Sequence, residues 1–95
     1  MKKYEVMYII KPDLDADSTS KVIANVNEIF SKNDGKVVSC DEIGLKDLAY
    51  EIDHFNKGFY VKLIVEAGTQ AVSEFNRIIR ITETVIRYVI ISVEE

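Results

Sequence analysis

Hydrophobic residues recur along this chain with two periods, one near 2 residues and one near 3.6 residues, as expected for strands and helices. The shorter period predicts strands over residues 3–10, 36–52, 59–66 and 85–93. The longer period predicts one helix after the capping candidates of residues 13–20 and a second helix that opens at Gly68-Thr69, with Thr69 as its cap. The predicted order is strand, helix, strand, strand, helix, strand.

Turn residues separate these elements. Asn33-Asp34-Gly35 supplies a left-handed residue that ends the first helix. Residues 41–44 are irregular enough for a bulge in the long second strand, and residues 53–58 form a polar turn before the third strand. The second and third predicted strands are therefore antiparallel.

Each helix carries a single apolar stripe, so each has one face to bury. The two stripes consist of Val22, Ile23, Val26, Ile29 and Phe30, and of Val72, Phe75, Ile78 and Ile79. The element order with two one-sided helices predicts an α+β fold of the ferredoxin-like, split β-α-β type. In this fold both helices cover one face of a four-stranded antiparallel sheet.

The opposite sheet face is predicted to be open and apolar. Alternation places Tyr4, Val6, Tyr8 and Ile10 under the helices and leaves Met7 and Ile9 outside, together with Tyr60, Ile64 and one face of the last strand. A lone monomer seldom shows that much apolar surface to water. We therefore expect a macromolecular partner on this face.

Composition narrows the class of protein. The 95 residues, 47% hydrophobic and 29% charged, suit a single domain over residues 1–95. No apolar run is long enough for a membrane span, no signal core follows Met1, and Cys40 is the single cysteine, so a cytoplasmic protein is expected. The net charge of −4 repels phosphates, so any nucleic-acid role depends on a local basic patch.

Catalytic and metal chemistry find little support in the sequence. The chain has one histidine and one cysteine; His54 is interpreted as a solvated turn residue and Cys40 as a packing residue. Asp13, Asp15 and Asp17 resemble the first ligands of a calcium loop, but the glycine and the distal glutamate of such a loop are missing, which favours helix capping. No enzymatic activity, metal, cofactor or small-molecule substrate is predicted.

Two features bear on nucleic-acid binding. Residues 57–61, KGFYV, partly match the strand motif of RNA-recognition domains, but alternation turns Phe59 and Val61 toward the helices, which favours a turn glycine followed by a core strand. The basic residues allow two readings. They either gather near one sheet edge or are scattered over the surface and the helix ends; the four that would gather are Lys2, Lys3, Arg80 and Arg87.

Several motifs in one register carry a family resemblance. They are Tyr4-Glu5, the block GLKDLAYEI over residues 44–52, Gly58-Phe59-Tyr60, and Arg80 with VIRY over residues 85–88. Together they span essentially the whole chain, which closely resembles the bacterial small-subunit (30S) ribosomal protein S6 family.

The resemblance implies a non-enzymatic structural protein of the small ribosomal subunit. It implies binding to the central domain of 16S ribosomal RNA as a heterodimer with ribosomal protein S18. By position, the rRNA-binding residues would be Lys2, Lys3, Lys46, Arg80 and Arg87. The partner protein would meet the open sheet face and the long second strand, at Met7, Ile9, Tyr50, Tyr60 and Ile64.

Three departures from the family pattern limit what is carried over. Asp47 stands where a second basic residue is usual, and Glu51 replaces a frequent proline. The sequence stops at Glu95, where many members continue into a tail, so contacts of such a tail are expected to be absent. The alternative is a small ferredoxin-like regulatory domain that dimerises through its open face, because this fold serves many unrelated functions.

Overall fold

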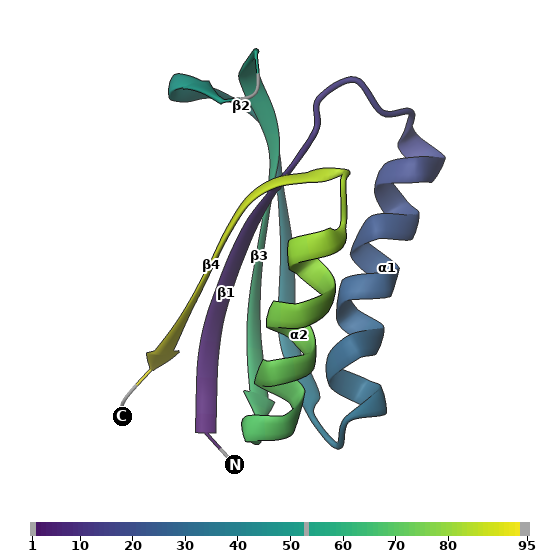
Figure 1. Cartoon of the computed structure of the whole chain (residues 1–95), viewed down its shortest axis with the longest axis vertical. Coiled ribbons are helices and arrows are strands. Elements are labelled where there is room, and N and C mark those ends of the chain that lie inside the picture. The colour runs from purple at the N-terminus through teal and green to yellow at the C-terminus, as the bar shows by residue number, and fades with distance from the viewer. Residues whose placement is uncertain (1, 53, 94–95) are drawn as a thin grey trace.

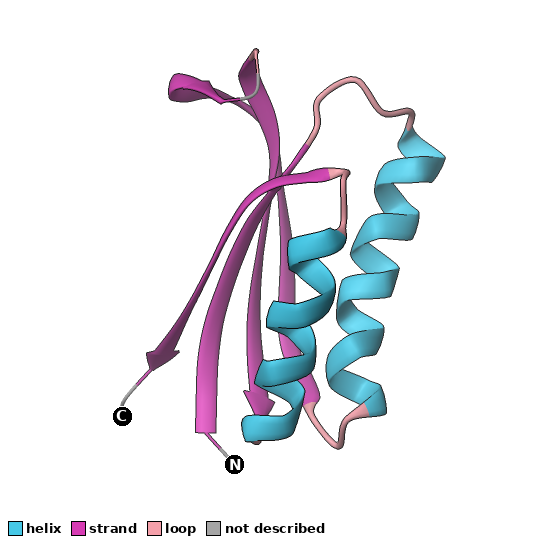
Figure 2. Cartoon of the chain, viewed as in Figure 1, coloured by secondary structure: helices cyan, strands magenta, loops and turns pink. Residues whose placement is uncertain are grey.

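The computed structural model describes residues 2–52 and 54–93. Its elements, in order, are β1 (Lys2–Ile10), α1 (Ala16–Lys32), β2 (Lys36–Ile52), β3 (Phe55–Ala67), α2 (Thr69–Ile81) and β4 (Val85–Val93) (Figure 1). The strands form one antiparallel sheet in the order β2-β3-β1-β4. Both helices lie on the same face of that sheet (Figure 2). The predicted ferredoxin-like α+β fold is therefore confirmed.

The core lies between the helices and the sheet, where the alternation predicted it. Val6, Tyr8 and Ile10 of β1 are fully buried, as are their neighbours Val61 and Leu63 in β3. The two helices contribute their predicted apolar stripes to this core. The stripe of α2 differs in two respects: Ala71 is also buried, and Val72 and Ile78 are only partly buried. Burial of apolar area on this single face supplies most of the driving force for folding.

Three aromatic rings join the two helices to β4 inside this core. The rings of Phe30 in α1 and Phe75 in α2 stack with their centroids 5.3 Å apart. Tyr88 of β4 meets Phe75 edge-on at 5.9 Å. Offset stacking and edge-to-face contacts are the favoured arrangements for aromatic pairs. Phe75 is thus the residue on which both helix packing and β4 packing depend.

Local hydrogen bonds fix both ends of α1. Asp15 is the N-cap, and the Ser18 backbone N–H donates to its carboxylate over 2.8 Å. At the other end Asp34 takes the left-handed conformation, with φ of 62°, and the Gly35 N–H donates to the Phe30 carbonyl over 2.7 Å. Such a bond closes the last helical turn. Capping by the acidic run and a left-handed stop within residues 33–35 are therefore confirmed.

The Asp15 cap predicts a pH-dependent stability. The bonds from Ser18 lower the pKa of Asp15 below its ordinary value of 3.8. A lowered folded-state pKa means that the stabilisation is present above the ordinary value and is lost as the pH falls through the folded-state value. We expect Asp15→Ala to lower the melting temperature at pH 7, and the difference from wild type to shrink below about pH 4.

Asp15→Asn is the control, because asparagine caps without ionising; its melting temperature should stay close to wild type at pH 7. Equal melting of wild type and Asp15→Ala at pH 7 would contradict the cap.

β2 and β3 continue beyond the end of β1 as a two-stranded arm. The last row shared by all four strands joins Leu45, Phe59, Ile10 and Val85, and past it the arm consists of residues 46–52 and 55–58. The arm bends away from the helices, toward the open face of the sheet (Figure 1). The pairing of β2 with β3 shifts register at three points, including the one predicted near residues 41–44. The long, interrupted second strand is therefore confirmed.

The arm also corrects the predicted turn over residues 53–58. β3 begins at Phe55 rather than at Phe59, and the reversal falls at His54, whose φ is 70°; Asp53 lies outside the described residues. Gly58 is thus a strand residue, paired with Lys46, and not the turn glycine. A Cβ at Gly58 would lie 2.2 Å from Cγ2 of Ile9, so glycine is required there by packing.

Two smaller expectations were wrong. Gly68 is the N-cap of α2, and Thr69 is the first residue inside the helix. Cys40 is exposed on β2 rather than packed.

Candidate functional site

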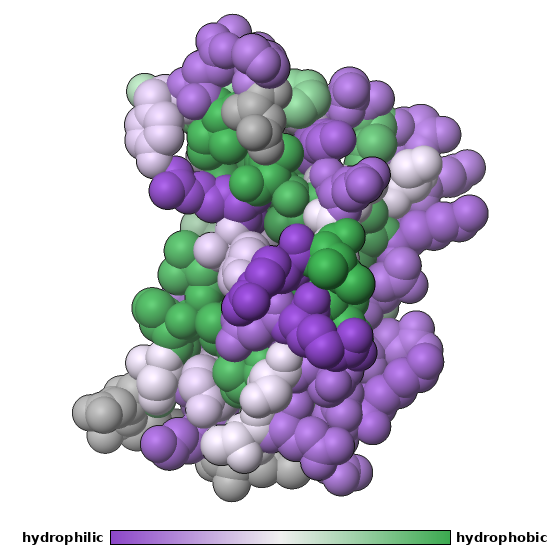
Figure 3. Space-filling view, viewed as in Figure 1, coloured by the Kyte–Doolittle hydropathy of each residue, from purple (hydrophilic) through white to green (hydrophobic). Residues whose placement is uncertain are grey.

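Apolar side chains collect on the sheet face that the helices leave open. Val89 and Ile91 of β4 are 51% and 50% exposed, and Met7, paired with Val89, is half-buried beside them. Ile64 and Tyr60 of β3 are also half-buried. Hydrophobic surface lies over β4 and beneath the arm, whereas the surface over α1 is hydrophilic (Figure 3). An exposed apolar sheet face of this kind is typical of a protein interface.

One predicted member of this face is not accessible. Ile9 points to the open face but is only 8% exposed. The side chains of Ile9 and Leu48 both lie beside Gly58, so the base of the arm covers that part of the sheet. The accessible apolar surface, called the open face below, therefore consists of Met7, Tyr60, Ile64, Val89 and Ile91.

A polar pair crosses the middle of this open face. The Lys62 ammonium lies 3.2 Å from the Glu5 carboxylate, and both side chains are about one-third exposed. A surface pair of this kind contributes little to stability. It does fix the charge pattern that any partner of the open face must match.

The arm touches β4 through Tyr50 and Arg87. The Arg87 guanidinium donates a hydrogen bond to the Tyr50 hydroxyl and lies over the Tyr50 ring, 5.5 Å from its centroid. This hydrogen bond raises the pKa of Arg87, so the guanidinium stays charged. Both residues are exposed to solvent, with Tyr50 at 59%. The contact joins residues 37 positions apart in the sequence.

The predicted basic residues do not all gather. Lys3, near the start of β1, lies opposite Val93, whereas Arg87 lies opposite Ile9, six residues further along β1. At about 3.3 Å per residue the two sites are roughly 20 Å apart. Of the two readings of the sequence, the gathering of Lys2 and Lys3 with Arg80 and Arg87 at one edge is therefore wrong, because neighbouring strands run in opposite directions.

Arg80 and Arg87 do lie at the same end of the molecule, where α2 ends, β4 begins and the arm projects (Figure 1). Arg80 and Lys11 line an open hollow of about 670 Å³ that Phe55 of the arm also borders. On the arm itself Lys46 and Lys57 line a shallow hollow of about 380 Å³. We call these five cations the basic end: Lys11, Lys46, Lys57, Arg80 and Arg87.

Lys57 and Lys11 were missed by the sequence prediction. Lys57 is the cross-strand partner of Asp47 in the arm. Lys57 and Lys46 line the same shallow hollow, so Lys57 supplies a second positive charge where Asp47 departs from the family pattern. The string KGFYV contained this lysine, but only the strand pairing places it opposite Asp47.

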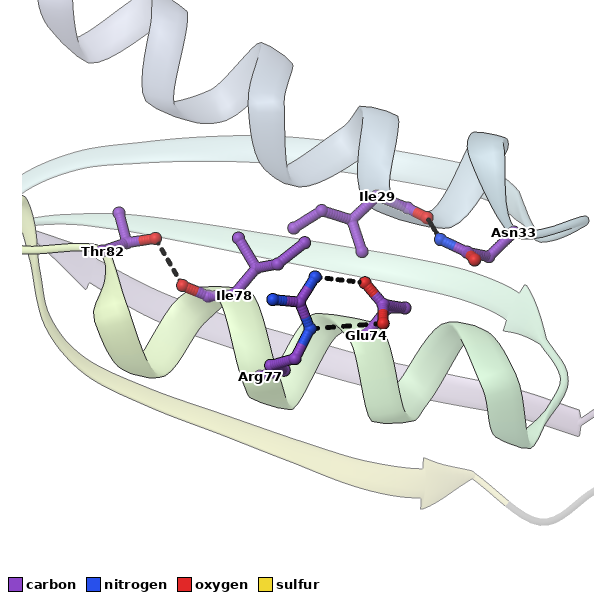
Figure 4. Close-up of polar contacts among 6 residues, drawn as sticks. All are labelled: Ile29, Asn33, Glu74, Arg77, Ile78 and Thr82. Atoms are coloured by element: carbon purple, nitrogen blue, oxygen red, sulfur yellow. Dashed lines mark hydrogen bonds and ion pairs between the residues drawn. The ribbon is translucent and has the colours of Figure 1, made fainter.

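Other polar residues have structural roles. On the helix surface Arg77 makes an ion pair with Glu74 at 2.8 Å, while Thr82 and Asn33 donate to backbone carbonyls of their own helices (Figure 4). His54 is solvated in the turn, as predicted, with its side chain 98% exposed. Val61 is fully buried under the helices, which confirms that the KGFYV string presents no stacking surface there. None of the described helices is long and apolar enough to cross a membrane.

The fold and surface together define a ferredoxin-like α+β binding protein with an apolar open face and a basic end. Residues 3–92 match the family model described as ribosomal protein S6. The chain is 49% identical to small ribosomal subunit protein bS6 of Acholeplasma laidlawii, covering 92% of each protein, and 45% identical over the full length of both to that of Shouchella clausii. The chain belongs to the ribosomal protein S6 family.

Solved structures agree with this assignment. The crystal structure of 30S ribosomal protein S6 from Thermotoga maritima superposes with a TM-score of 0.92 at 27% identity, covering 97% of this chain and 87% of that one. The P2 domain of the chemotaxis kinase CheA shares only the fold, with a TM-score of 0.61 at 15% identity, covering 97% of this chain and 98% of that one. Family membership confirms the resemblance and places the chain among structural, non-enzymatic ribosomal proteins.

Proposed function

We propose that this protein is a structural component of the cytoplasmic small ribosomal subunit and binds the central domain of 16S ribosomal RNA together with ribosomal protein S18. The observation that carries the proposal is the adjacency of the basic end and the open face in a chain of net charge −4. The open face takes the protein partner, and the basic end takes RNA phosphates. Lys2 and Lys3, at the opposite end of β1, form a second and separate RNA contact.

Charge explains why two proteins are needed. An acidic chain is repelled by RNA at long range, and a few local cations give weak, salt-dependent affinity. A partner bound at the open face adds its own RNA contacts to the same complex. Once one of the two proteins has bound RNA, the RNA contacts of the other form at a high effective concentration. The heterodimer should therefore bind far more tightly than either chain alone.

The test is a binding titration of a central-domain rRNA fragment. The fragment is titrated with this protein, with S18, and with an equimolar mixture of the two. We expect the mixture to bind more than about tenfold more tightly than this protein alone. Equal affinity of the isolated protein and the mixture would refute the argument from charge.

Charge reversal at Arg87 tests the basic end directly. Arg87→Glu should weaken RNA binding by the heterodimer by about tenfold or more at low salt, because it replaces a phosphate contact by repulsion. The side chain is exposed, so the melting temperature should change little. Lys21→Glu, with the same charge change at an exposed site on α1, is the matched control and should bind almost as wild type. Unfolding of Arg87→Glu, or equal loss in both variants, would remove Arg87 from the RNA contact.

A further inference from the structure

We propose that Tyr50 is a positioning residue for Arg87 and thereby couples the protein partner to RNA binding. This inference rests on the proposed function, because it assumes that Arg87 meets RNA phosphate. Its basis is the contact between the arm and β4, in which the Tyr50 hydroxyl accepts a hydrogen bond from Arg87 and the Tyr50 ring lies under the guanidinium.

The geometry leaves most of the guanidinium free to bind a phosphate. Arginine has five N–H donors in a planar fork, and the hydrogen bond to Tyr50 uses one nitrogen, Nη1. The ring fixes the plane of the fork from one side. A side chain held in this way loses less rotamer freedom when it binds a phosphate than a free arginine does. Tyr50 therefore raises the RNA affinity of Arg87 without contacting RNA.

A purely structural role does not account for this pair. Both residues are exposed, and exposed cation–π pairs contribute little to folding stability. The arm is already seated on the sheet by Leu48 and Ile9 beside Gly58. The Tyr50 contact is therefore not needed to hold the arm, and its main effect is on the orientation of Arg87.

The same contact links the two binding surfaces. Tyr50 is exposed on the arm, which bends toward the open face, so an apolar protein surface docked on that face also shields Tyr50 from water (Figure 1). Cation–π attraction strengthens when water is excluded. Docking of the partner then holds Arg87 more firmly, and RNA bound to Arg87 favours the partner by the same factor.

A double-mutant cycle on the full-length heterodimer tests the proposal. RNA affinity is measured at saturating partner for wild type, Tyr50→Leu, Arg87→Gln and the double variant, with the rRNA fragment described above. Tyr50→Leu should weaken RNA binding by about two- to fivefold. It should have no further effect in the Arg87→Gln background. Tyr50→Phe, which keeps the ring, should recover most of the affinity.

Two further measurements separate positioning from folding. Melting temperatures of the three single variants should stay close to wild type. In the free protein, the NMR signals of the Arg87 δ-methylene protons should show a ring-current shift that is kept in Tyr50→Phe and lost in Tyr50→Leu. Loss of this shift together with a non-additive cycle supports the positioning role.

Two outcomes would overturn the proposal in distinguishable ways. If Arg87→Gln weakens RNA binding but the effects of the two substitutions add, Arg87 binds RNA as proposed and Tyr50 does not position it. If Arg87→Gln binds RNA as wild type does, the RNA role of Arg87 in the proposed function fails, and the positioning role fails with it.

Discussion

Phe75→Ala is expected to destabilise the fold by about 3–5 kcal/mol, the usual cost of removing a buried phenyl ring. Phe75 is fully buried, stacks on Phe30 and meets Tyr88 edge-on. The substitution therefore opens a cavity where aromatic rings of α1, α2 and β4 meet. A 95-residue protein has a total stability of only about 5–14 kcal/mol, so a large part of it should be lost. Chemical denaturation, fitted with one m value for both proteins, measures the difference in their free energies of unfolding.

Ile81→Ala on the same helix is the matched control. Ile81 is 71% exposed, so its truncation should change stability by no more than about 0.5 kcal/mol. Phe75→Leu, which refills part of the volume, should fall between the two. A cost below about 1 kcal/mol for Phe75→Ala would show that the helices are not held by this cluster.

The main fold was predictable because burial here is one-sided. In β3 every second residue from Val61 to Ala67 is buried under the helices, and Lys62 and Glu66 alternate with them on the other face. Each helix likewise has one stripe to bury. Periodicity records such one-sided burial directly, and so element order, sheet topology and the core faces followed from it.

The arm was not predictable from the same signal. Asn56 and Lys57 are exposed although they belong to β3, because no helix covers the arm. A strand exposed to water needs no apolar alternation, and polar residues around His54 were therefore interpreted as one long turn. The bend of the arm, which buries Ile9 and brings Tyr50 to Arg87, depends on contacts between distant segments and leaves no periodic trace.

The basic end shows the same limit for the site. Arg80 and Arg87 were placed at one end by the element order, which the structure confirms. Lys2 and Lys3 were grouped with them because β1 and β4 are neighbours, but an antiparallel pair puts the two strand starts at opposite ends. Lys57 joined the site only through its pairing with Asp47. The sequence predicted which strands are neighbours. It did not predict the register of their pairing, which determines which charged side chains lie close together.

Gly58→Ala is expected to destabilise the fold by about 1–3 kcal/mol, although it adds a single methyl group. The new Cβ would lie 2.2 Å from Cγ2 of Ile9, a distance that real Cβ contacts do not show. Ile9 is β-branched and stiff at χ1, and it is buried between the sheet and the arm. Either β1 or the arm must move, and movement of the arm shifts Tyr50 away from Arg87. RNA affinity of the heterodimer should therefore fall together with stability.

The background Ile9→Ala isolates this clash, because it removes the methyl group that the new Cβ would strike. Ile9→Ala by itself lowers stability, since Ile9 is only 8% exposed. In the Ile9→Ala background, Gly58→Ala should lower the free energy of unfolding clearly less than it does in wild type. Denaturation of wild type, the two single variants and the double variant gives the coupling energy between the two positions. An equal cost in both backgrounds would show that the backbone of β3, rather than the approach of Ile9, requires glycine at position 58. A smaller cost in the Ile9→Ala background would show that the close approach of Ile9, where the arm packs onto β1, requires glycine at position 58.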